Sequence, residues 1–151
     1  MPRAAATSAI HLARNCVFRT TTVAENVEQL THILDAVKSI NPKIKAVITV
    51  SPVPLNTTLE MPSPVIADCL SKSTLRLAAH EVSQASNDRV QYWPSFEIVR
   101  WLATHHGVVF GGEDGSSFHV NESVIEAIVD SFVDVFGAPD LKVNEHPKDH
   151  V

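Results

Sequence analysis

The chain has 151 residues, of which 44% are hydrophobic and 19% are charged, and its formal net charge is −5. This length and apolar content suit one folded domain and exclude disorder as the main state. The acidic balance argues against a nucleic-acid partner, and the most apolar stretch, 127–136, is too short and too charged to span a membrane. The two cysteines are too few for a disulfide framework, which favours a reducing, cytoplasmic setting.

The two ends of the chain differ in composition from its middle. Before Glu25, the first acidic residue, three arginines stand among many Ala, Ser and Thr residues. This composition is typical of an organelle transit peptide or of a poorly ordered leader. Two prolines and little periodicity predict a tail at 138–151. We therefore expect a leader at 1–21, a domain at 22–137 and a tail at 138–151.

The first predicted element is a helix. Thr22-x-x-Glu25 is a capping box, which marks a helix start, and Asn41-Pro42 ends the helix. Between these signals, apolar residues recur at alternating steps of four and three and share one face. They are Val23, Val27, Leu30, Leu34 and Val37. The β-branched run 44–50 that follows predicts a buried parallel strand.

A long loop and a second helix come next. Four prolines make 51–64 a loop. The second helix is predicted over about 71–84, and the residues expected to face inward are Leu75, Ala78, Ala79 and Val82. Residues 90–93 form a second strand candidate, which Pro94 ends. Cys69 is expected to be a small buried residue rather than a nucleophile, because no basic partner adjoins it.

The last third of the chain predicts three further elements. Ser95 is expected to cap a short helix through about Thr104, and 107–110 is a third strand candidate. A final helix starts near Asn121 and ends at Gly137. Its wide apolar face consists of Val124, Ile125, Ile128, Val129, Phe132 and Val133. Trp93, Phe96 and Trp101 are expected to be core or pocket-wall residues.

The alternation of helices and strands predicts a parallel sheet covered by helices. In such sheets, chemistry takes place beyond the carboxyl ends of the strands. The loops at 51–55, 94–97 and 111–121 are therefore the candidates for a functional site.

The segment Asp114-Gly115-Ser116-Ser117-Phe118-His119 is the strongest local candidate for chemistry. A histidine acts as a general base when a carboxylate fixes its tautomer, and one loop can present both groups. The alternative is an Asp and a His in a Gly/Ser turn that caps the last helix. No Gly-x-Ser-x-Gly elbow is present, and Ser51, Ser73 and Ser116 have no distinguishing context.

Neither a metal nor a cofactor is indicated by the sequence. Gly111, Gly112 and Gly115 lack the ending of a phosphate-binding loop and are better interpreted as a flexible turn. His146 and His150 have helical spacing, but a proline lies between them and no third ligand is near. A solvated tail is the preferred interpretation.

Three segments, taken in order, are similar to stretches of a known family. They are Ile48-Thr49-Val50-Ser51-Pro52-Val53-Pro54-Leu55, Ser71-Lys72-Ser73-Thr74-Leu75-Arg76 and Tyr92-Trp93-Pro94-Ser95-Phe96-Glu97-Ile98. Asp114 to His119 and the closing helix form a fourth matching element. Together they resemble the GSCFA domain family, which is related to the SGNH or GDSL-like esterases, over about residues 17–136.

This resemblance implies an α/β fold, a three-layer flavodoxin-like (SGNH-type) parallel sheet, and ester hydrolase or acyltransferase chemistry. It places the catalytic histidine on His119 and its orienting aspartate on Asp114, with a spacing longer than the usual Asp-x-x-His. The Gly-Ser-Cys-Phe-Ala segment that would supply the nucleophile and the first strands is absent. The chain is thus expected to be a C-terminal part of the domain that is inactive alone.

The resemblance also bears on partners. A small-molecule or glycan ester is the implied substrate, with no cofactor. A sheet that lacks its first strands exposes an edge, which predicts self-association or a companion chain carrying the serine. The alternative is a non-catalytic remnant or a binding domain.

Overall fold

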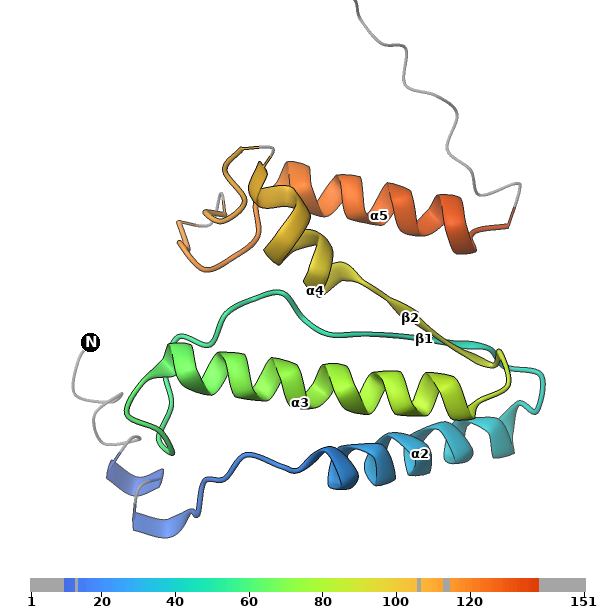
Figure 1. Ribbon diagram of the computed structural model, residues 1–151, viewed down its shortest axis with the longest axis horizontal. Coiled ribbons are helices and arrows are strands. Elements are labelled where there is room, and N and C mark those ends of the chain that lie inside the picture. The colour runs from blue at the N-terminus through green and yellow to red at the C-terminus, as the bar shows by residue number, and fades with distance from the viewer. Residues whose placement is uncertain (1–9, 13, 106, 113–114, 139–151) are drawn as a thin grey trace, which may run out of the picture. The chain divides into compact units, whose positions relative to one another are not determined.

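The computed structural model describes residues 10–12, 14–105, 107–112 and 115–138. The elements, in chain order, are α2 (Val23–Ile40), β1 (Ala46–Thr49), α3 (Pro64–Ala85), β2 (Val90–Trp93), α4 (Ser95–Glu97), η1 (Ile98–Leu102), η2 (Ala103–His105) and α5 (Glu122–Phe136) (Figure 1). β1 and β2 pair side by side and run parallel, and α3 connects them. This mixture confirms the α/β class.

The described residues fall into two compact units. Unit 1 comprises Met1–Val50 and Pro54–Tyr92, and unit 2 comprises Ser51–Val53 and Trp93–Val151, in each case as far as the chain is described. No helix among the described residues has both the length and the apolar content needed to cross a membrane.

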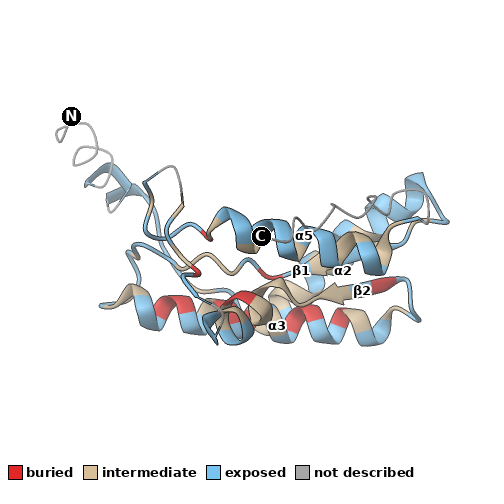
Figure 2. Ribbon diagram, turned by 90° about the horizontal axis from the view of Figure 1, so that it is seen from above, coloured by how far each residue is buried: buried red, intermediate tan, exposed pale blue. Residues whose placement is uncertain are grey.

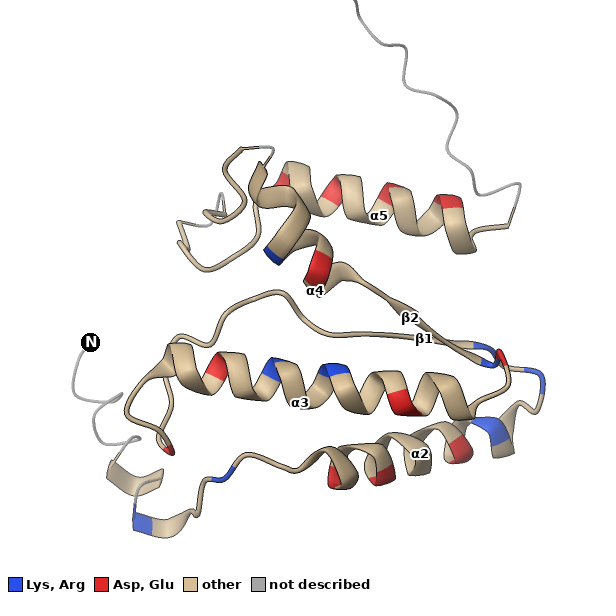
Figure 3. Ribbon diagram, in the orientation of Figure 1, with Lys and Arg blue, Asp and Glu red and all other residues tan. Residues whose placement is uncertain are grey.

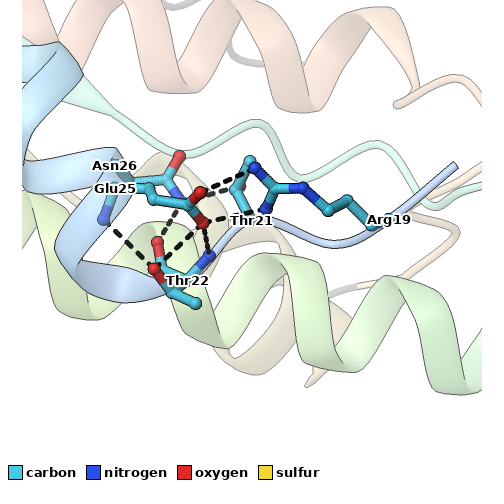
Figure 4. Close-up of polar contacts among 5 residues, drawn as sticks. All are labelled: Arg19, Thr21, Thr22, Glu25 and Asn26. Carbon is cyan, nitrogen blue, oxygen red and sulfur yellow. Dashed lines mark hydrogen bonds and ion pairs between the residues drawn. The ribbon is translucent and has the colours of Figure 1, made fainter. Parts of the chain in front are cut away.

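The start of α2 confirms the predicted capping box (Figure 4). The Glu25 amide donates to Thr22 Oγ1 at 3.2 Å, and the Thr22 amide donates to Glu25 Oε2 at 2.8 Å. Arg19 adds a two-pronged ion pair to the same carboxylate, with N–O distances of 2.9 and 2.6 Å. The hydrogen bond from Arg19 and those from Thr22 lower the pKa of Glu25 to about 2. The sequence therefore fixes this helix start through polar contacts at an exposed site.

The strand β1 is shorter and less buried than predicted. The expected strand over 44–50 is reduced to Ala46–Thr49, in which partly buried and exposed residues alternate. Val47 is 37% exposed, and only Val50, just after the strand, is buried. A strand covered on one face alternates in this way, so the expectation of a fully buried strand was wrong.

The helix α3 begins earlier than predicted. It starts at Pro64 rather than near Ser71, with Ser63 at the N-cap position. A proline suits the first turn of a helix because its missing N–H has no partner there in any case, so Pro64 begins the helix and does not belong to the loop.

Burial along α3 also departs from the prediction (Figure 2). Ala78, Ala79 and Val82 are buried as predicted, but Leu75 is 37% exposed. Cys69 is exposed as well, so the expectation that it is buried was wrong. The residues that take the buried positions instead include three polar ones, which are Asp68, Lys72 and Thr74.

The helical run 95–105 in unit 2 has the predicted extent but a different start. Pro94, not Ser95, occupies the cap position, and no side chain caps this end. The run changes from α-helix through a π-helical turn to a 3₁₀ turn. The predicted third strand at 107–110 is only a single antiparallel bridge, between Phe110 and Val120.

The core of unit 2 is small. Val99, Val109 and Val120 form its buried centre, at 0%, 6% and 7% exposure. Trp93 packs edge-on against Phe132 and Phe136, with ring centroids 5.4 and 5.8 Å apart. Trp101, expected to be a core or pocket-wall residue, is 67% exposed, so it is not part of the core.

The helix α5 confirms its predicted bounds. Asn121 caps it by accepting the Ser123 amide at 3.1 Å, and Gly137 follows its last residue. None of its residues is fully buried, despite the wide apolar face.

Candidate functional site

Unit 2 brings parts of the three candidate loops together. Val53, from the first loop, packs against the buried cluster of Val99, Val109 and Val120. Val109 precedes the third loop, Val120 lies near its end, and Val99 follows the second loop. A shared valine core therefore anchors segments that are distant in sequence.

Arg100 is the polar residue that connects these loops. Its Nε donates to the Pro52 carbonyl at 2.9 Å, which ties it to the first loop. Its guanidinium lies 5.8 Å from the ring centroids of both Phe96, in the second loop, and Phe110, beside the third. An arginine suits this role because its planar cation stacks on aromatic faces while its N–H groups donate.

The sequence analysis did not select Arg100, although a signal was present. It is the single Lys or Arg between residues 90 and 141. An isolated cation within an apolar helix between aromatic residues is a pattern that could have singled it out (Figure 3).

The third loop has a backbone held by its own hydrogen bonds. The Gly111 amide donates to the His119 carbonyl at 2.9 Å, and the Asn121 amide donates to the Val109 carbonyl at 2.8 Å. Gly111 and Gly115 have φ values of 117° and 78°, which disfavour residues with a Cβ. The glycines thus make a turn, in line with the interpretation chosen from the sequence.

His119 lies at the end of this turn, one residue before the bridge to Phe110 and three before α5 begins. Its carbonyl is held by Gly111, and the residue is exposed. Asp114 lies outside the described residues, so the pairing of the two side chains stays a prediction.

The contacts of Ser51, Ser73 and Ser116 do not single out one of them as a nucleophile. Ser51 Oγ accepts the Val53 amide at 3.3 Å, and Ser116 Oγ accepts the Phe118 amide at 3.4 Å. Ser73 lies on an exposed position of α3. The first two hydroxyls stabilise turns.

A row of charged residues on α3 is the second notable polar feature, and it lies in unit 1. Asp68, Lys72 and Arg76 follow at steps of four and so share one face of the helix. Asp68 and Lys72 are only 5% and 8% exposed. Charged side chains are seldom buried to this extent without a specific role.

The contacts of this row hold two neighbouring segments against α3. Asp68 Oδ1 accepts the Leu55 amide at 2.9 Å, which fixes the end of the first loop segment. The Arg76 guanidinium lies 4.1 Å from the centroid of the Tyr92 ring, in β2. The first and third segments quoted for the family resemblance therefore both contact α3, the helix that contains the second segment, and the sequence analysis missed these contacts.

The structure also bears on metal binding. In the part of the chain that the structure describes, no three His, Cys, Asp or Glu side chains gather to hold a metal ion. His146 and His150 lie outside that part.

These features define an α/β protein in which an exposed loop histidine, His119, lies next to the buried valine cluster of unit 2. Residues 4–132 match the GSCFA family, and the chain belongs to that family. The match begins within the segment expected to be a leader. No curated protein and no solved structure matches the chain.

Proposed function

We propose that this chain supplies the base and its orienting acid to a GSCFA serine ester hydrolase or acyltransferase, with His119 as the base and Asp114 as the acid. The observation that carries the proposal is the family match over residues 4–132, which includes the His119 loop. Support comes from the hydrogen-bonded turn that presents His119 at an exposed position. The proposed frame is a three-layer SGNH-type sheet.

In the proposed reaction, the His119 imidazole takes the proton of a serine hydroxyl as that oxygen attacks an ester carbonyl. The imidazolium then returns the proton to the departing alcohol oxygen, which leaves an acyl-serine. Water completes a hydrolysis, and another hydroxyl completes an acyl transfer. The serine would come from outside the printed sequence, and the substrate would be a small-molecule or glycan ester.

The cellular setting is part of the proposal. Cys16 and Cys69 are both exposed free thiols. Free thiols at exposed positions suit a reducing compartment, for which we propose the cytoplasm.

The pairing of Asp114 with His119 can be tested on the chain as it exists. A carboxylate that accepts a hydrogen bond from the imidazole Nδ1–H group favours one tautomer of the ring. Nitrogen-15 NMR should therefore show a single neutral tautomer of His119, which becomes a mixture in Asp114→Asn. Asp130→Asn, which removes an exposed carboxylate of α5, is the control. A mixture in the unaltered chain would contradict the proposal.

Activity provides the second test. The chain alone should not hydrolyse p-nitrophenyl acetate above background, because no serine is activated. If the DNA upstream of Met1 encodes a Gly-Ser-Cys-Phe-Ala segment in frame, the extended protein should be active. His119→Ala should then lower kcat by about 10³-fold or more, and His105→Ala should not. Turnover by the chain alone that depends on His119, or an extended protein insensitive to His119→Ala, would overturn the assignment.

A non-catalytic interaction domain is the second candidate, and a specific observation favours it. Large apolar side chains stand exposed on α3 and α5, among them Val65 and Ile66 on α3 and Val129 and Val135 on α5, at 70%, 57%, 51% and 64% exposure. The described sheet has two strands, so each strand has an unpaired edge. Self-association through these surfaces predicts a mass above that of a monomer in light scattering at micromolar concentration, and a stable monomer would count against it.

A further inference from the structure

A cavity of about 560 Å³ opens in unit 1, at a distance along the chain from every residue of the proposed ester site. It is bounded by α2 from Val27 to Lys38, the last turns of α3 and the first residues of β1 and β2. Because β1 and β2 are parallel, their first residues lie at the edge opposite the carboxyl ends. The volume falls within the range of small-molecule sites, which is about 300–1,000 Å³.

The cavity combines an apolar wall with a charged rim. The apolar lining consists of Val27, Leu34, Ile44, Ala46, Val82, Ala85 and Val90. The rest of the lining is polar and includes two acidic residues, Asp35 and Glu81, and two basic residues, Lys38 and Arg89, beside Thr31, Ser86 and Asn87. None of these four side chains forms a hydrogen bond or an ion pair with another residue that the structure describes. Charges of both signs thus remain available beside an apolar surface.

The rim on the side of α3 has a fixed shape. Asn87 and Asp88 adopt left-handed conformations, with φ values of 49° and 63°, where residues other than glycine are uncommon. The Ser86 hydroxyl accepts the Val90 amide at 3.1 Å, and the Arg89 carbonyl accepts the Ala46 amide at 2.9 Å. These bonds hold the turn that carries Asn87 and Arg89 into the cavity lining.

We infer that this cavity binds a small zwitterion with an apolar body, such as an amino acid with a large apolar side chain. The apolar body contacts the valines and Ile44. The ammonium group lies toward the carboxylates of Asp35 and Glu81. The carboxylate lies toward Lys38 and Arg89. This site is separate from the ester chemistry and does not depend on it.

The test uses the full chain, uniformly labelled with nitrogen-15, and titrates it with L-phenylalanine. Saturable amide shifts are expected at residues that line the cavity, with a dissociation constant of about 1 mM, the range set by so small a ligand. N-acetylphenylalanine, which keeps only the anion, and phenethylamine, which keeps only the cation, should each bind several-fold more weakly. Benzyl alcohol, which has neither charge, should bind weakest.

Two adjacent substitutions provide a matched pair. Ala85 lines the cavity and is exposed, so Ala85→Trp fills the space without disturbing the core and should weaken L-phenylalanine binding at least tenfold. Gln84, the preceding residue of α3, is also exposed but does not line the cavity, and Gln84→Trp should leave binding unchanged.

Charge variants keep the test decisive if Ala85→Trp does not fold. Asp35→Asn should weaken L-phenylalanine and phenethylamine about two- to fivefold and spare N-acetylphenylalanine, and Lys38→Gln should show the reverse selectivity between the two single-charge ligands. Absence of saturable shifts, shifts confined to residues away from the cavity, or equal affinity for the zwitterion and either single-charge ligand would overturn the inference.

Discussion

The helices α3 and α5 differ in what they bury. α3 buries Asp68 and Lys72 while leaving Leu70 and Leu77 at 46% and 54% exposure. α5, whose apolar face is wider, has no fully buried residue. The sequence of a helix shows which side chains could be buried. Which of them are buried depends on the segments that pack against the helix. α3 has a strand and a loop against its polar row, and these contacts outweigh the preference of its leucines.

A large loss of stability is expected from removing the buried acid of α3. Asp68→Ala leaves the Leu55 amide without its acceptor, which should lower the free energy of unfolding by about 1–3 kcal/mol. Asp130→Ala, which removes an exposed carboxylate from α5, should change it by less than about 0.5 kcal/mol. Urea denaturation of both variants measures the difference, and equal effects would break the comparison.

A pH titration sharpens the comparison at an exposed helix start. The pKa of Glu25 is lowered from 4.5 to about 2 in the folded chain, mainly by its hydrogen bond with Arg19. A lowered pKa means that the ionised group stabilises the fold above pH 4.5 and that this stability is lost as the pH falls toward 2. Glu25→Gln should therefore show a smaller loss of stability over that range than the unaltered chain. Glu28→Gln, on the same helix, is the control, and identical profiles for the unaltered chain and Glu25→Gln would contradict the assignment.

A smaller gain is expected from the acidic ladder of α5 (Figure 3). Its four acidic residues follow at steps of four and are Glu122, Glu126, Asp130 and Asp134. Its last turn has no basic residue. Asp134→Lys exchanges a repulsion with Asp130 for an attraction and places a cation at the helix C-terminus, which should stabilise the chain by about 0.5–1 kcal/mol. Asp134→Asn, which only removes the repulsion, should give a smaller gain, and a loss of thermal stability in the lysine variant would refute the account.

The smallest change in stability is expected from an exposed apolar residue of α5. Val129 is 51% exposed, so Val129→Gln should alter the free energy of unfolding by less than about 0.5 kcal/mol. Val82→Gln, at 6% exposure on α3, should cost more than about 2 kcal/mol because it buries an amide without a partner. If Val129→Gln proves as costly as Val82→Gln, this face of α5 is covered in solution. A lower mass of the variant than of the unaltered chain in light scattering would then show that a second copy of the chain covers it.

Local signals predicted some elements closely. The capping box of α2, the proline after β2 and the Asn121 and Gly137 boundaries of α5 each depend on neighbouring residues, and all are confirmed. The start of α3 was missed because Pro64 satisfies both a loop and a helical first turn, and sequence alone does not separate the two. The strand predicted at 107–110 failed because its partner, Val120, is antiparallel and makes one bridge.

The candidate site divides in the same way. The loop that carries His119 was located from glycines, a helix start and the family resemblance, all of which lie in the sequence. Arg100 and Asp68 were not found, because their roles come from contacts with Pro52 and Leu55, far along the chain.

The sequence by itself determined the α/β order of elements, the capped start of α2, both ends of α5, the end of β2 before Pro94, and the family to which the chain belongs. Only the tertiary structure decided that α3 buries Asp68 and Lys72, that Arg100 connects the loops of unit 2, and that a cavity opens at the first residues of β1 and β2. The physical reason is range: capping and turn formation involve residues within a few positions of each other, whereas burial and long-range hydrogen bonds depend on which distant segments come into contact.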